Sequence, residues 1–249
     1  MRALRILLIL TVVIGGLFIA ADRIAVNLAE SEVADRVRSS QGLSSTPEVS
    51  INGFPFLTQV VDKRLEDVDV SLGGLSATAG GRTVNVTEVK AELRDVKVNS
   101  SYSSAVAGRA DGSARISYAD LTKAAPEGAR VTFAGAERAA KNQVKIEGVL
   151  ADVLKGAGIS LPRAAEALLG DRSVSTYSTV ELRGGDTIRL KADALPSIPV
   201  PGLGDKLRDA VDYELKIEKM PSSLKLDRLE TTRGGLEFAG TGRGVALVG

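Results

Sequence analysis

The chain has 249 residues, with 32 Lys and Arg against 31 Asp and Glu, and it contains no Cys, His or Trp. Without Cys and His there is no disulfide, no thiol nucleophile, no Ser-His-Asp triad and no thiolate or imidazole metal site. A hydrophobic fraction of 44% indicates a globular protein, and a net charge of +1 argues against a nucleic-acid partner. We therefore expect no cofactor, no metal and no conventional catalytic site.

A basic start and an apolar run open the chain. Arg2 and Arg5 precede the uncharged run Ile6–Ala21, and Asp22 follows it. The run is close to the lower limit of about 17 residues for a spanning helix, and its flanking charges place the N-terminus in the cytoplasm. Residues 1–21 are predicted to be a signal anchor or signal peptide, and residues 22–249 a single extracytoplasmic domain exported across the plasma membrane. Cleavage, which would secrete the domain, and retention of the anchor both remain open; we favour the anchor.

A helix is predicted from Asp22 to about Arg38, ended by the segment Ser39–Gly42. Apolar residues recur every three or four positions on one face: Val26, Ala29, Val33 and Val37. This pattern is typical of a helix packed on a sheet or of a stalk leaving a membrane. It does not favour a helix lying on the bilayer surface, because an aromatic anchor and a Lys/Arg stripe are lacking. Packed in a sheet, the helix would offer Val33 and Val37 as candidate lipid-lining residues.

From Glu48 onward the dominant hydrophobic period is two, which predicts antiparallel strands. The alternating segments are Val49–Ile51, Val68–Leu72, Val84–Leu93, Ala110–Ile116, Val144–Ile146, Thr179–Leu182, Thr187–Leu190, Tyr213–Ile217 and a final pair within Leu224–Leu247. Gly-Gly pairs at 80–81, 184–185 and 234–235 predict hairpin turns, because the central positions of the favoured turn need positive φ. A phase slip between Val86 and Val89 predicts a β-bulge.

Fewer segments predict helices. Ser117 is a suitable N-cap for a short helix that begins at Tyr118, and the ranges 152–156, 163–169 and 205–210 are further candidates. The proline-rich segment Leu195–Gly202 excludes a helix interior or a central strand and predicts an extended connector. The fold class expected from these elements is α+β, mostly antiparallel β, with an N-terminal membrane helix.

One spacing matches an enzyme motif, Ser222-Ser223-Leu224-Lys225, which has the Ser-x-x-Lys form of some serine acylases. That motif needs a helix start for the lysine to reach the serine. Here it follows Pro221 and leads into a strand. We interpret the match as coincidence and predict no catalytic residue.

The segment Gly53–Val60 carries two of the five Phe residues within three positions, on either side of Pro55. Because proline cannot donate to a ladder, the segment is predicted to be an edge, a bend or the rim of an opening. The spacing alone favours a hydrophobic plug under a loop. The second interpretation is a rim that admits an apolar ligand. It has these lipid-binding candidates: Phe54, Pro55, Phe56, Leu57 and Val60, with Lys63 and Arg64 as head-group contacts.

The run Gly53–Val60, followed by a strand at Glu66–Val70, resembles the LmeA-like family of cell-envelope phospholipid-binding proteins in actinobacteria. The segments Met220–Leu226, Gly234–Leu236 and Gly240–Gly242 resemble the same family. Between about Leu121 and Tyr177 the chain is richer in alanine than this pattern. The resemblance implies a tubular lipid-binding architecture, a long curved antiparallel sheet wrapped around a helix, which holds phospholipid acyl chains and is associated with envelope glycolipid assembly.

The leading hypothesis is a non-enzymatic phospholipid carrier or sensor at the cell envelope, with phospholipid as its partner. Burial of one long acyl chain supplies more than about 10 kcal/mol before costs, and it needs no ionisable catalyst. The alternative is a structural or adaptor envelope protein with a filled core and no lipid ligand. A lipid hydrolase that uses Ser, Lys and carboxylates is a third and weaker hypothesis, and protein partners are not predicted.

Overall fold

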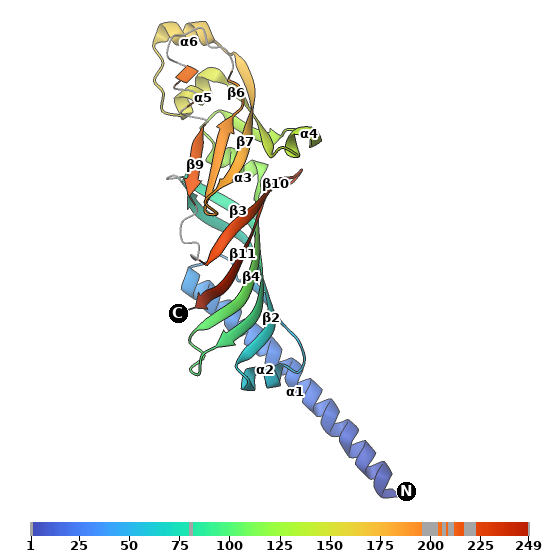
Figure 1. The fold of residues 1–249 in the computed structure, drawn as a ribbon. Coiled ribbons are helices and arrows are strands. Elements are labelled where there is room, and N and C mark those ends of the chain that lie inside the picture. Colours follow the sequence, from blue (N-terminus) through green and yellow to red (C-terminus); the bar gives the residue numbers. More distant parts are fainter. Residues whose placement is uncertain are drawn as a thin grey trace. The chain divides into compact units, whose positions relative to one another are not determined.

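The computed structural model describes residues 2–79, 82–195, 204–205, 208, 212–216 and 223–248 (Figure 1). The predicted Gly80-Gly81 turn, the connector from residue 196 onward, most of the 205–210 helix and Ser222 lie outside these residues. Two compact units make up the chain, and each is described by itself. Unit 1 comprises Met1–Leu72, Lys90–Asp111 and Gly242–Gly249, and unit 2 comprises Gly73–Val89 and Gly112–Thr241.

The described residues form short helices, one long helix and two sheets. The helices are α1 (Arg2–Gln41), α2 (Phe56–Val61), α3 (Tyr118–Ala124), α4 (Ala136–Ala139), α5 (Leu150–Gly156) and α6 (Arg163–Leu169). The strands are β1 (Glu48–Asn52), β2 (Arg64–Ala79), β3 (Arg82–Val98), β4 (Ala105–Ser117), β5 (Ala129–Phe133), β6 (Gln143–Val149), β7 (Ser173–Arg183), β8 (Thr187–Ala192), β9 (Tyr213–Lys216), β10 (Leu224–Thr231) and β11 (Gly235–Val248). One sheet has the order β1-β2-β3-β4-β11-β10 and the other β5-β6-β7-β8-β9. The predicted α+β class is confirmed.

Helix α1 is continuous over 40 residues, so the apolar leader and the predicted amphipathic helix are one element. In its first half, Arg2–Ala21, every side chain is exposed, and this half extends away from the strands in Figure 1. By length and composition α1 is able to cross a membrane. It ends at Gln41, and Gly42 follows at φ +63°, the left-handed position that favours glycine after a helix. The predicted end of the helix is confirmed.

The second half of α1 packs into unit 1. Val26 and Ala34 share a buried cluster with Ile51, Leu93 and Val245, from strands β1, β3 and β11. The predicted apolar face is wrong at one position.

Val33 is 40% exposed, whereas its neighbour Ala34 is only 6% exposed. The sequence pattern favoured the larger apolar residue, but the small side chain of Ala34 lets the helix approach the strands closely. Val37 is half-buried, as the predicted face requires.

The edge strand β1 of the six-stranded sheet, which lies in unit 1, is contacted by α1. Strand β1 pairs antiparallel with β2, with Ile51 opposite Val68 and Val49 opposite Val70. The free side of this edge strand donates elsewhere, since the Ile51 N–H donates to Glu30 Oε1 of α1 at 2.7 Å. An edge amide that is bonded in this way is not available for pairing with another chain.

Strand β3 is long and contains one left-handed residue. Asp95 has φ +58°, and it separates Leu93 from Val96, two buried residues that an unbroken alternation would place on opposite faces. The bulge predicted between Val86 and Val89 stays a prediction. The alternation breaks visibly at Asp95 instead.

Unit 2 contains the five-stranded sheet, whose four strand pairs are all antiparallel. The hairpin turns at Gly184-Gly185 and Gly234-Gly235 are confirmed, and so are α6 and, two residues earlier than predicted, α5. Ser117 caps α3 as predicted, because its Oγ accepts the Asp120 N–H at 3.1 Å. Three short elements were not predicted: α2, α4 and β5.

Candidate functional site

The Phe-Pro-Phe segment forms a corner between β1 and α2 in unit 1. Pro55 occupies the N-cap position of α2, and no cap hydrogen bond comes from its side chain. The cap comes instead from α1, where Asp22 Oδ1 accepts the Leu57 N–H at 2.9 Å. Asp22 is fully buried and is also paired with Arg23. A carboxylate at a helix N-terminus satisfies an open amide and complements the helix dipole.

The two Phe residues of this corner have opposite environments. Phe56 is 5% exposed and packs in the core of unit 1, where Leu57 and Val60 are partly buried against the same cluster. Phe54 is 58% exposed, and the Arg23 guanidinium lies 5.5 Å from its ring centroid. Phe56 is therefore the plug of the first interpretation. Phe54 is left as the only one of the two Phe side chains available to an outside partner.

The two predicted head-group cations already have protein partners. Arg64 is paired with Asp95, with Nε at 2.7 Å from Oδ1. Lys63 donates from Nζ to Ser100 Oγ at 3.1 Å. Both side chains are exposed, so their role toward a phosphate stays a prediction, but the charge of Arg64 is locally compensated.

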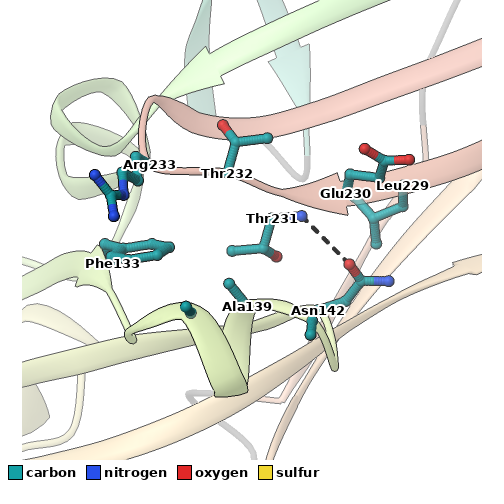
Figure 2. Close-up of a pocket in the computed structure, with 10 residues that line it drawn as sticks. Phe133, Ala139, Asn142, Leu229, Glu230, Thr231, Thr232 and Arg233 are labelled. Carbon is teal, nitrogen blue, oxygen red and sulfur yellow. Dashed lines mark hydrogen bonds between the residues drawn. The ribbon is translucent and has the colours of Figure 1, made fainter.

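Unit 2 has an open pocket of about 540 Å³, a volume typical of small-ligand sites. Its floor is formed by α4 and the end of β5, and its opposite wall by the end of β10 and the turn that follows (Figure 2). The lining residues are Phe133, Ala136, Ala139, Ala140, Asn142, Leu229, Glu230, Thr231, Thr232 and Arg233. Apolar and polar side chains therefore meet in the same cavity.

Tyr118 holds one wall of the pocket in place. Its ring contacts the Phe133 ring at a centroid distance of 6.4 Å, and its hydroxyl donates to the Thr232 carbonyl oxygen at 2.7 Å. Burial raises the pKa of Tyr118 to about 12, so the hydroxyl remains a donor at any physiological pH. The hydrogen bond from Tyr118 to Thr232 is therefore retained across that pH range.

Asn142 joins the floor to the opposite wall. Its Oδ1 accepts the Thr231 N–H at 3.3 Å, as drawn in Figure 2, and its backbone carbonyl oxygen accepts the Val180 N–H at 2.8 Å. Asn142 has φ +54°, a conformation that asparagine tolerates better than most residues. One residue therefore fixes α4, β7 and β10 around the cavity.

Thr231 leaves a polar group unsatisfied in the pocket wall. The residue is buried, and its Oγ1 has no hydrogen-bond partner in the described part of the chain. An unsatisfied buried hydroxyl costs about 1–3 kcal/mol.

Arg233 supplies a positive charge at the pocket. It lies in the turn between β10 and β11, which is closed by the Thr232 N–H donating to the Gly235 carbonyl oxygen at 2.8 Å. Gly235 is required there, because a Cβ would lie 2.0 Å from the Ile116 carbonyl oxygen. The Arg233 side chain is exposed, and within residues 2–79, 82–195 and 223–248 it has no ion pair. In Figure 2 it lies at the same end of the pocket as Phe133.

Carboxylates do not gather into a metal site here. Within the part of the chain that the structure describes, no three Asp or Glu side chains converge in a way that would hold a metal ion. The pocket itself contains one carboxylate, Glu230, so its chemistry is that of apolar contact, hydrogen bonding and one cation.

Comparison with known proteins identifies the family. The fold and pocket define an α+β protein with an apolar N-terminal helix and a cavity suited to a partly apolar ligand. A family model described as LmeA-like phospholipid-binding matches residues 20–241, nearly the whole chain after the apolar run. The chain belongs to this LmeA-like phospholipid-binding family, which confirms the resemblance. No curated protein and no solved structure matches the chain.

Sequence reasoning did not find the pocket. Its floor comes from the alanine-rich segment, where three small side chains on and after α4 leave space that larger residues would fill: Ala136, Ala139 and Ala140. The available signal was this cluster of alanines beside a single Phe. Without the facing strand β10, about 90 residues later, the cluster is indistinguishable from an ordinary helix.

Proposed function

We propose that this protein is a non-enzymatic phospholipid carrier or sensor, which holds part of a lipid in the pocket of unit 2. The observation that carries the proposal is a partly apolar cavity in a member of a phospholipid-binding family. An acyl segment would lie against Phe133, Ala136 and Leu229. Each buried methylene would contribute about 0.8 kcal/mol.

The polar side chains of the cavity suit a lipid head group. Arg233 offers a guanidinium that can bind a phosphate through two parallel N–H donors. A phospholipid brings an apolar and an anionic part together, which matches the chemistry of the lining better than a purely apolar ligand does.

The proposed location is the outer side of the plasma membrane. Arg2 and Arg5 before the apolar run support a cytoplasmic N-terminus, and the continuous helix α1 supports an uncleaved anchor. The remainder of the chain would then work at the cell envelope, where it would support lipid or glycolipid assembly. The lipid contacts predicted from the sequence at the β1–α2 corner belong to the same proposal, with Phe54 as the exposed member.

Native mass spectrometry of the full-length protein, released from detergent after incubation with anionic phospholipid vesicles, tests the proposal. We expect a bound phospholipid in the unmodified chain. Ala136→Phe fills the pocket from an exposed position, and loss of two methylene contacts, about 1.6 kcal/mol, weakens binding more than about tenfold.

Glu137→Phe is the matched control, since it adds the same ring to α4 outside the pocket lining. It should retain the lipid. A lipid-free mass for the unmodified chain would contradict the proposal and favour a structural envelope protein. Equal lipid binding by the Ala136→Phe and Glu137→Phe proteins would show that the lipid does not bind in this pocket.

A further inference from the structure

Within unit 1, the exposed apolar half of α1 continues directly into the packed half of the same helix. The exposed apolar run ends at Ala21, and the next residue, Asp22, is fully buried and bonded to the Leu57 N–H. The helix continues through this point without a break. The surface of unit 1 around Asp22 is therefore held within one residue of the end of the apolar run.

The apolar run is too short to cross a bilayer unaided. Sixteen residues from Ile6 to Ala21 span about 24 Å at 1.5 Å per residue, against a hydrocarbon thickness of about 30 Å. The shortfall of about 6 Å corresponds to about four further residues of helix. With Arg5 at the inner boundary, the outer boundary falls at about Ala25, three residues beyond Asp22.

The side chains at that level have the chemistry of a membrane interface. Ile24 is 62% exposed and continues the apolar surface of α1 past Asp22. The exposed Phe54 ring lies beneath the guanidinium of Arg23, the neighbour of Ile24 in the chain, and Arg23 is itself partly exposed. Aromatic rings favour the interface, and arginine extends its charge to the phosphate level while its stem stays in apolar surroundings.

We infer that Arg23, Ile24 and Phe54, the interface corner, are embedded in the outer interface of the bilayer. Ile24 and Phe54 enter the upper acyl region, and Arg23, which is paired with Asp22 through one nitrogen, presents its remaining N–H donors to lipid phosphate. This makes the lipid surface a direct partner of unit 1, in addition to any lipid held in unit 2. The inference rests on the proposed anchor. It also explains why Phe54 is exposed although Phe56, two residues later in the same corner, is buried.

The absence of Trp from the chain gives a clean probe. Phe54→Trp, Val33→Trp and Phe18→Trp each create a single-tryptophan full-length protein at an exposed position. Each is reconstituted into phosphatidylcholine–phosphatidylglycerol vesicles with bromine on the acyl carbons near the head group. Val33 lies ten residues after Arg23, about 15 Å further along the helix axis, and serves as the matched control.

We expect the emission of the Phe54→Trp protein to be blue-shifted and quenched by the brominated lipid. The emission of the Val33→Trp protein should be water-like and unquenched. The Phe18→Trp protein reports the anchor, with a second lipid that is brominated near the chain ends.

Two outcomes would overturn the inference in different ways. Quenching of the Phe18→Trp protein, with the Phe54→Trp protein behaving like the Val33→Trp control, would overturn the interface corner alone. An unquenched Phe18→Trp protein would overturn the anchor and the corner together, while lipid binding in unit 2 would still be measurable by mass spectrometry.

Discussion

The two units differ in what lies against their apolar side chains. In unit 1 the interior is filled by the protein's own helix, because Val26 and Ala34 of α1 occupy the cluster that Phe56 and Leu93 line. In unit 2 the alanines of α4 leave a cavity of about 540 Å³ opposite β10. Unit 2 has packed cores as well, such as the cluster of Val144, Val180 and Leu236, and it carries the open cavity in addition.

The two units also differ in where the capping residues of their short helices come from. In unit 1, α2 receives its cap from Asp22, 35 residues earlier in the chain than Leu57. In unit 2, α3 is capped by Ser117, the residue directly before it. Unit 1 is therefore organised by a distant segment, which makes its order depend on α1. In unit 2, the start of α3 is set by a residue that is adjacent in the sequence.

Phe56→Ala should give the largest effect. It removes a buried ring and should lower the stability of unit 1 by about 3–5 kcal/mol, whereas Phe54→Ala should stay within about 0.5 kcal/mol. Hydrogen exchange measured by mass spectrometry should show lost protection in β1 and α2 but not in β6 and β7. An equal loss of protection in all four elements would show that the two units unfold together as one cooperative unit.

Asp22→Ala should come next. Loss of the cap leaves the Leu57 amide without its acceptor and Arg23 without its partner, at a cost of about 2 kcal/mol. Exchange at the start of α2 should accelerate. Asp35→Ala, at an exposed position of the same helix, is the control and should leave this exchange unchanged. Identical exchange in both variants would show that α2 does not depend on α1.

Asp120→Asn should have the smallest effect, and it depends on pH. The hydrogen bond from the Ser117 hydroxyl holds the pKa of Asp120 below its ordinary value of 3.8. A carboxyl with a lowered folded-state pKa contributes stability above pH 3.8, and this contribution is lost as the pH falls through the lowered value.

The variant should therefore cost about 1 kcal/mol near neutral pH and almost nothing in acid. Urea unfolding of unit 2 at the two pH extremes measures the difference, with the exposed Asp171→Asn as control. A cost that persists in acid would assign the stabilisation to side-chain shape and not to charge.

Most strands could be predicted from the sequence, and the pocket could not. Alternation located β1, β6, β7, β8 and β10, and β8 illustrates the reason, because its Ile188 and Leu190 are buried on one face. Helix α3 was predictable because its cap is adjacent, and α2 was not because its cap is Asp22. Val33 was predicted to lie on the buried face because it is the larger apolar residue. The structure buries its smaller neighbour Ala34 instead.

Asp22 both follows the apolar run directly and caps α2, and this bears on when a leader could be removed. The bond between Ala21 and Asp22, where the predicted signal segment ends, lies inside a continuous hydrogen-bonded helix and next to a buried carboxylate. A peptidase acts on an accessible, locally unfolded segment. Once Asp22 of α1 has docked against α2, the backbone at this bond is held in helical conformation, although the side chains before it are exposed. Under the proposal made above for residues 1–21, removal of a leader would have to precede the docking of Asp22, and a chain that docks first would keep its anchor.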